Sequence, residues 1–231
     1  ALEEEAEADE AAHKGSLKEL FTRHFPQICL ASAAAFLGIG GFFVMSTYVL
    51  SYATTALDFE RQTVVNATLL AAVCQIFINL IFGRLGEKFG PGRIIGFGGV
   101  ATAVMAWPLW AMIDSGNVVL LTLAVCLGLS LVTITYSVSG VLLSEIFPAN
   151  VRYSGVAISA NIASAVAGLL PFLATAMNAS NDAPSPIPGI IILAVAALIT
   201  AYGGFAGEKH RRDDDIVVSD YPNPPAGGAE A

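Results

Sequence analysis

The segment Gly83–Arg93 carries one acid, three bases and four glycines within eleven residues. Glycine permits a tight turn and a close helix approach, and Glu87 is able to interact with the positive N-terminal end of a neighbouring helix. The bases can pair with acids or with lipid phosphates. We interpret the segment as a gate that controls a conformational change, with a merely basic surface loop as the alternative. Its candidate residues are Gly83, Arg84, Leu85, Glu87, Lys88, Gly90 and Arg93.

A second charged segment, Leu143–Gly155, is expected to act in the same way. Proline stops one helix, and glycine lets another begin close by. We expect Glu145 and Arg152 to pair across the turn, and that pair must be partly buried, because an exposed one contributes only about 0–1 kcal/mol. A static turn with snorkelling charges is the alternative. The candidate residues are Glu145, Pro148, Arg152 and Gly155.

Neutral polar side chains inside long apolar segments form a third candidate set. Polar groups at the depth of lipid usually face protein or water rather than acyl chains. They are therefore candidates to line a substrate cavity, while helix-to-helix hydrogen bonding is equally open, and Tyr52 has interfacial anchoring as a further alternative. The candidates are Tyr48, Tyr52, Gln75, Asn79, Thr133, Tyr136, Ser137 and Asn161.

The elements that must position these residues are membrane-spanning helices. Hydrophobic residues make up 55% of the sequence and charged residues 13%, which is too apolar for an ordinary soluble domain. A helix of roughly 20 apolar residues crosses a hydrocarbon core of about 30 Å, and lipid cannot satisfy an open backbone. None of the predicted spans contains an acid, a base or a histidine. The six spans are 28–52, 64–82, 94–113, 118–143, 156–177 and 187–205.

The positive charges predict which ends of the six spans face the cytoplasm. Ten of the eleven Lys and Arg residues lie on one side of the six spans, and only Arg61 lies on the other. Positive charge resists translocation, so we predict a multi-pass protein of the plasma membrane with both termini in the cytoplasm. Residues 1–26 are predicted to be an acidic linker with a short surface helix, residues 27–206 the transmembrane domain, and residues 207–231 a disordered tail.

Several function classes are not indicated. The sequence shows no phosphate-binding loop, no metal-ligand cluster and no Ser/His/Asp arrangement, so we expect no enzyme activity, no cofactor and no metal. The net charge of -8 lies mainly in the two tails and does not suggest a nucleic-acid partner. The spans contain no Asp, Glu or His that could carry a proton. We interpret Cys29, Cys74 and Cys126 as packing residues.

The first charged segment resembles the signature loop of the major facilitator superfamily, which reads Gly-x-Leu-x-Asp-Arg/Lys-x-Gly-Arg-Arg/Lys. Glu87 replaces the usual Asp. Pro91 and Gly92 stand where two bases are usual, and Arg93 restores one of them late. The matching residues are Gly83, Leu85, Lys88 and Gly90.

The second segment closely resembles the metabolite:proton symporter family, a branch of that superfamily. Its members carry Glu-Leu-Phe-Pro-x-x-Val-Arg-Tyr-Ser/Thr-Gly, and Ile146 here replaces Leu. The resemblance extends from Ser16 to about Phe205, as the second half of a twelve-span protein. The matching residues are Glu145, Phe147, Pro148, Val151, Arg152, Tyr153, Ser154 and Gly155.

This resemblance implies an all-α half of a major-facilitator fold, made of two inverted three-helix repeats with substrate held near the midplane. It implies proton-coupled uptake of a small polar metabolite, either an organic acid or a proline/betaine-like solute. The partners would be the lipid bilayer, a missing N-terminal six-helix half or a second copy, the substrate and protons. The alternatives are a six-span sensor or assembly subunit that does not transport, and a truncated inactive fragment.

Overall fold

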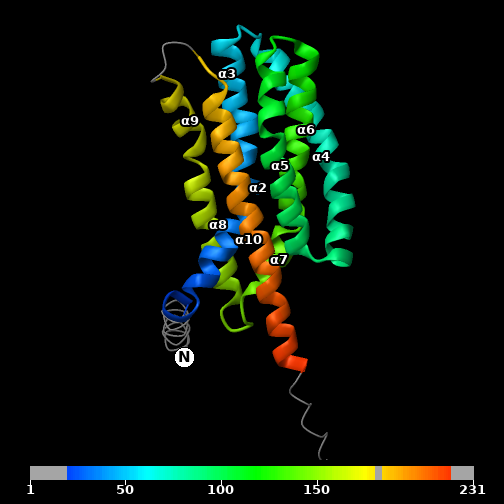
Figure 1. The fold of residues 1–231 in the computed structure, drawn as a ribbon, viewed down its shortest axis with the longest axis vertical. Helices are drawn as coiled ribbons and strands as arrows, with labels where there is room; N and C mark the ends of the chain where they lie inside the picture. The colour runs from blue at the N-terminus through cyan, green and yellow to red at the C-terminus, as the bar shows by residue number, and fades with distance from the viewer. Residues whose placement is uncertain (1–19, 180–183, 220–231) are drawn as a thin grey trace, which may run out of the picture.

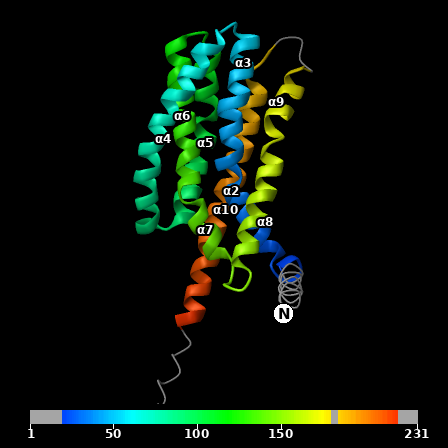
Figure 2. The same cartoon turned by 180° about the vertical axis from the view of Figure 1, so that it is seen from behind.

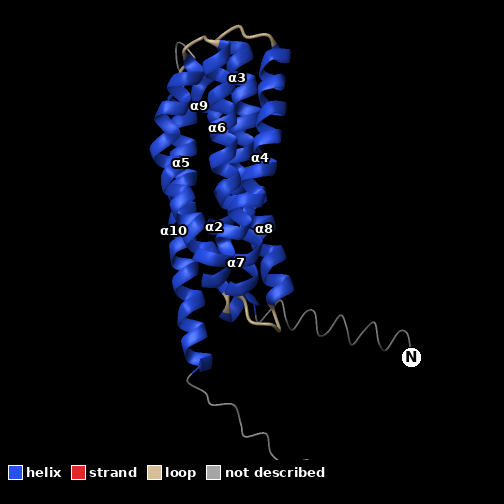
Figure 3. Ribbon diagram, turned by 90° about the vertical axis from the view of Figure 1, so that its right-hand side faces the viewer, coloured by secondary structure: helices blue, strands red, loops and turns tan. Residues whose placement is uncertain are grey.

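The computed structural model describes residues 20–179 and 184–219, and the regular secondary structure of these residues is entirely helical (Figure 3). Six helical spans in this part of the chain are long and apolar enough to cross a membrane. They stand side by side as one elongated bundle (Figure 1). The predicted fold class, an all-α polytopic membrane protein, is confirmed.

Three spans are continuous and three are interrupted. The continuous ones are α4 (Arg61–Phe89), α5 (Pro91–Asp114) and α10 (Ile187–Ser219). The first span consists of α2 (Phe25–Phe43), the π-helix η1 (Val44–Tyr48) and α3 (Val49–Ala56). The fourth consists of α6 (Val118–Ser137) and α7 (Ser139–Ile146), and the fifth of α8 (Arg152–Ala167) and α9 (Leu170–Ala179).

Local sequence accounts for two of these interruptions. Pro171 has no N–H to donate to the carbonyl of Ala167, so α8 ends there and α9 begins at Leu170. Between α6 and α7, the hydroxyls of Ser137 and Ser139 each donate to a carbonyl three residues earlier at 2.8 Å. Such side-chain bonds compete with the helical backbone pattern.

The packing of the last three spans repeats that of the first three. α4 packs against α6 as α8 packs against α2, and α5 packs against α6 as α10 packs against α2. α2 and α6 are central, while α4 and the α8–α9 pair lie on opposite sides of the bundle (Figures 1 and 2). The second and third spans thus pack against the fourth, just as the fifth and sixth pack against the first. Because the first and fourth spans run in opposite directions, this is the arrangement of two inverted repeats.

One end of the bundle, which we call the basic end, carries Arg84, Lys88, Arg93 and Arg152. The first span begins there and the sixth span ends there (Figure 1). α4 continues through Phe89, so the predicted connection Gly83–Arg93 contains a single non-helical residue, Gly90. Gly90 has a φ of 94°, and Pro91 occupies the first position of α5.

The sixth span also continues past its predicted end. α10 remains helical through Ser219 and projects beyond the other helices at the basic end (Figures 1 and 3). Glu208 is only 4% exposed. The prediction of a disordered tail from residue 207 is therefore wrong for residues 207–219, because buried contacts hold the start of this segment in the bundle. Residues 1–19 of the predicted linker and surface helix (residues 1–26) and the last residues, 220–231, lie outside the described part.

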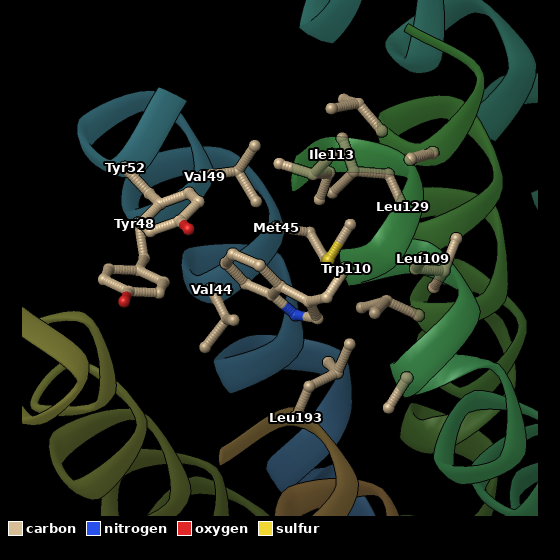
Figure 4. Packing of buried hydrophobic residues seen from close by; sticks show 14 of the residues in the cluster. Val44, Met45, Tyr48, Val49, Tyr52, Leu109, Trp110, Ile113, Leu129 and Leu193 are labelled. Atoms are coloured by element: carbon tan, nitrogen blue, oxygen red, sulfur yellow. The ribbon is translucent and has the colours of Figure 1, made fainter. Parts of the chain in front are cut away.

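The larger hydrophobic core lies toward the end opposite the basic end. Trp110 is fully buried there, and its ring centroid lies 5.4 Å from that of Tyr48 and 5.6 Å from that of Tyr52 (Figure 4). Met45 and Leu193 pack into the same cluster. Aromatic rings at such separations stabilise a core beyond the area they bury. This core packs the first, third and sixth spans against one another.

Candidate functional site

A cavity of about 330 Å³ lies between α2, α4 and α6, close to the middle of the first, second and fourth spans. No charged side chain lines it. Its lining combines two amides, two hydroxyls and aromatic rings. The lining residues are Gly38, Ile39, Phe42, Phe43, Gln75, Asn79, Val132, Thr133 and Tyr136.

Helical spacing places the amides of this cavity. Gln75 and Asn79 lie one turn apart on α4, so both side chains face the same direction. Gln75 Nε2 donates to the Leu129 carbonyl at 3.4 Å, and the Thr133 hydroxyl donates to the same carbonyl at 2.7 Å. The Gln75 bond joins α4 to α6, whereas the Thr133 bond lies within α6. The side chains of both Gln75 and Asn79 line the cavity.

A close helix approach places the aromatic wall. A Cβ on Gly38 would lie 3.0 Å from Cδ2 of Tyr136, so glycine allows α2 to pass against this ring. Tyr136 and Phe42 are both exposed, and both line the cavity. Ring faces and neutral hydrogen-bonding groups can together bind a small polar solute, and cation–π contacts can hold a cationic part of it.

Tyr48 and Tyr52, which the sequence assigns to the same cavity, lie elsewhere. Both are buried, and both line a second pocket of about 250 Å³ near the end opposite the basic end. The Tyr52 hydroxyl donates to Asp114 Oδ1 at 2.7 Å, and the Tyr48 hydroxyl accepts from Asn178 Nδ2 at 3.4 Å. Their contacts are thus helix-to-helix bonds, which was the alternative for these residues.

Ser137 and Asn161 are also absent from the lining of the cavity. The Ser137 hydroxyl donates to the Ile134 carbonyl at 2.8 Å within its own helix. Asn161 Nδ2 donates to the Ala157 carbonyl at 2.8 Å, on an exposed face of α8. The structure therefore brings together Gln75, Asn79, Thr133 and Tyr136 of the eight candidates.

At the basic end, a buried carboxylate joins the sixth span to the third. Glu208 Oε2 accepts a hydrogen bond from the backbone N–H of Gly92 at 3.1 Å, in the first turn of α5. A negative charge is stabilised at the N-terminus of a helix. A Cβ on Gly90 would lie 2.4 Å from Glu208 Oε1, so this glycine makes room for the acid. The sequence assigns such a helix-end contact to Glu87, which is exposed on α4.

Arg211 extends this contact to the fourth span. Its Nη2 lies 2.9 Å from Glu208 Oε1, and its Nε lies 3.6 Å from Glu145 Oε2. The prediction that Glu145 pairs with Arg152 is therefore wrong for this conformation. Arg152 Nε instead donates to the Phe147 carbonyl at 3.3 Å, because the Phe147–Val151 turn directs its side chain back along its own segment.

The remaining predicted gating residues fall into two groups. A Cβ on Gly155 would lie 2.6 Å from the Phe147 ring, so this glycine lets α8 start close to the turn after Pro148. Lys88 Nζ lies 5.3 Å from the Phe89 ring centroid, within the range of a cation–π contact. The charged members of the first segment are exposed at the bundle surface, and these are Arg84, Glu87, Lys88 and Arg93.

Sequence reasoning missed Glu208 and Arg211 because both lie in a segment taken as a solvated tail. One signal was present. Glu208 and Arg211 stand three residues apart, which is the spacing of a helical ion pair, and they follow three closely spaced glycines at 203, 204 and 207. Within the described residues, no group of His, Cys, Asp and Glu has the geometry of a metal site.

Comparison with known proteins shows that the chain is similar to membrane transporters. The family model of the Major Facilitator Superfamily matches residues 4–217. The chain is 28% identical over 189 residues to the proline/betaine transporter of Salmonella typhimurium, a match that covers 81% of this chain and 38% of that protein. It is 27% identical over 161 residues to the citrate-proton symporter of Klebsiella pneumoniae, covering 68% of this chain and 36% of that protein.

The chain thus spans less than two fifths of the length of these curated relatives. No solved structure matches it. The superfamily predicted from the two charged segments is confirmed by the family match, and six apolar helices make the chain a multi-pass membrane protein in contact with lipid.

Proposed function

The chain belongs to the Major Facilitator Superfamily, and we propose that it forms the second six-helix half of a secondary transporter. A small polar solute would move by alternating access, with this half rocking against another. The observation that carries the proposal is the cavity between α2, α4 and α6, which has the size of a small-molecule site and lies near the middle of the first, second and fourth spans.

The chemistry of the cavity favours a solute without net charge. Its lining contains amides, hydroxyls and aromatic rings but no charged side chain, and an unpaired charge is costly to remove from water. A proline- or betaine-like zwitterion satisfies this condition, and relatives named as proline/betaine transporters support it. An organic acid, as in the relative named a citrate-proton symporter, would require cations supplied from outside this half.

Proton coupling belongs to the same proposal. No Asp, Glu or His lines the cavity in the described part of the chain, so the proton carrier would lie in the partner half. That partner is an N-terminal six-helix half or a second copy of this chain. The distribution of ten of eleven cations favours the cell membrane with both ends cytoplasmic.

Uptake of labelled proline, glycine betaine and citrate into vesicles that contain the complete transporter tests this function. We expect saturable uptake of a zwitterion that is driven by an inward proton gradient and stops when an ionophore collapses the gradient. Uptake that does not depend on the proton gradient would contradict the proposed proton coupling but would still support a transport function. Binding of the solute without uptake or counterflow would instead support the sensor or assembly subunit.

A further inference from the structure

The hydroxyl of Thr200, on the sixth span, bonds two backbone groups of the first span that are partners in a regular helix. Thr200 Oγ1 accepts from the Leu37 backbone N–H at 2.8 Å and donates to the Ala33 carbonyl at 2.8 Å. In an α-helix an N–H donates to the carbonyl four residues earlier. We propose that Thr200 is a positioning residue, which acts through this turn of α2 on the cavity; its effect on a solute rests on the proposed transport function.

A close helix approach brings Thr200 to this turn. Gly203 lies three residues further along α10, on the same face of the helix. A Cβ on Gly203 would lie 2.4 Å from the Ala34 backbone nitrogen and 2.8 Å from the Ala33 carbonyl carbon. Glycine is therefore required for the backbones of α10 and α2 to meet here. The contact of the hydroxyl is thus supported by the packing of two helices and does not depend on the rotamer of Thr200 alone.

The fifth span also bonds this part of α2. The Ser32 hydroxyl donates to the Ser159 carbonyl of α8 at 3.1 Å. Ser32 immediately precedes Ala33, so the fifth and sixth spans both hold one short piece of the first span. Polar side chains form such helix-to-helix bonds at the depth of lipid. We call the residues that these bonds hold, Ser32–Leu37, the fixed segment.

Among the four buried threonines of the described residues, Thr200 differs in its partners. The others are Thr102, Thr133 and Thr135, and each donates to a carbonyl of its own helix. Thr200 instead bonds an N–H and a carbonyl of another helix. Its hydroxyl therefore sets how two spans lie against each other, whereas the other three hydroxyls act within one span.

The fixed segment leads directly into the wall of the cavity. Gly38 follows Leu37 and lines the cavity, and Phe42 lines it one turn later. A Cβ on Gly38 would lie 3.0 Å from Cδ2 of Tyr136, which lines the cavity from α6. Because α2 passes so close to this ring, a shift or rotation of α2 changes the position of the ring and the shape of the cavity.

Hydrogen–deuterium exchange and solute uptake of the complete transporter test the proposal. Thr200→Val keeps the shape of the side chain and removes the hydroxyl. We expect the amides of residues 33–43 to exchange about fivefold faster, which is the effect of one lost helix-to-helix hydrogen bond. The KM for the transported solute should rise about fivefold without a change in the maximal rate, because binding rather than turnover depends on the shape of the cavity.

Two further variants serve as controls. Thr200→Ser keeps the hydroxyl and should match the wild type in both exchange and KM. Thr102→Val removes a buried hydroxyl that bonds the Gly98 carbonyl of its own helix, and it should change neither value. If Thr200→Val does not accumulate in the membrane, Thr200→Cys replaces it. A thiol is a weaker hydrogen-bonding group, so smaller changes in the same direction are expected, and no change would overturn the proposal.

Equal exchange of residues 33–43 in Thr200→Val and Thr102→Val would overturn Thr200 as a restraint on α2. Faster exchange with an unchanged KM, or with a KM that Thr200→Ser does not restore, would overturn the positioning role. If the wild-type transporter neither binds nor takes up proline, glycine betaine or citrate, the proposed function fails separately. Exchange of residues 38–43 then decides without a solute whether Thr200 orders the cavity wall.

Discussion

The Glu208 carboxylate accepts a hydrogen bond from the Gly92 backbone N–H at 3.1 Å and thereby ties the end of the sixth span to the start of the third. A Cβ on Gly92 would lie 2.6 Å from Glu208 Cβ, so the contact requires glycine. Two glycines of the first charged segment, Gly90 and Gly92, therefore serve packing within this half. Arg211 links the same carboxylate to Glu145 on the fourth span.

Replacing Glu208 tests how much this contact contributes to the free energy of unfolding. Glu208→Ala removes the acceptor of the Gly92 N–H and one partner of Arg211, and we expect it to lower the free energy of unfolding by about 2–3 kcal/mol. Glu208→Gln keeps an oxygen acceptor and should cost less. Denaturation in mixed detergent micelles gives the values. Glu87→Gln, at an exposed acid on α4, is the control, and a loss equal to that of Glu208→Ala would contradict the assignment.

Two glycines of the same segment should respond in opposite ways to alanine. Gly90 has a φ of 94° and no space for a Cβ beside Glu208, so Gly90→Ala should destabilise the protein by about 2–4 kcal/mol. Gly83 lies inside α4, and a Cβ there would meet nothing within 4 Å. Gly83→Ala should be neutral or stabilising by up to about 1 kcal/mol. Thermal unfolding of the two variants separates these outcomes, and similar melting temperatures would refute the different roles.

Two asparagines in different positions, one in the cavity and one on an exposed helix face, test where the solute binds. Asn79 lines the cavity, whereas Asn161 bonds to the Ala157 carbonyl on an exposed face of α8. If the proposed function is right, Asn79→Leu should raise the KM for the transported solute about tenfold, which is the effect of one lost hydrogen bond. Asn161→Leu should leave KM unchanged. Uptake kinetics at equal expression measure both, and a larger effect at Asn161 would move the substrate site to the fifth span.

A double-mutant cycle identifies the partner of Glu145. Arg211 and Glu145 are partly exposed and 3.6 Å apart, so their coupling energy should be about 0.5–1 kcal/mol. The cycle between Glu145 and Arg152 should give no coupling, because Arg152 bonds to the Phe147 carbonyl. Unfolding free energies of the single and double alanine variants supply both cycles. Coupling to Arg152 alone would show that the populated conformation pairs these charges differently.

Much of the fold could be predicted from local pattern. Charge-free apolar segments predict six spans, since lipid leaves helices as the way to satisfy the backbone. Pro171 lacks the N–H that would continue α8, and α8 and α9 are separated near it. Gln75 and Asn79 could be assigned to one helix face from their spacing alone. Helix ends were less predictable, because α4 and α10 both continue into charged sequence that their neighbours stabilise.

The sequence by itself determined the number of spans, their alternating direction, the basic end and the superfamily, because each depends on composition or on contiguous motifs. Tertiary structure decided which polar residues meet. Tyr52 bonds Asp114, 62 residues away, and Glu208 bonds Gly92, 116 residues away. No local pattern encodes such contacts, since they depend on how the helices rotate and pack against one another. The same packing separates Asn79 in the cavity from Asn161 on the outer face, although their residue type and membrane setting are the same.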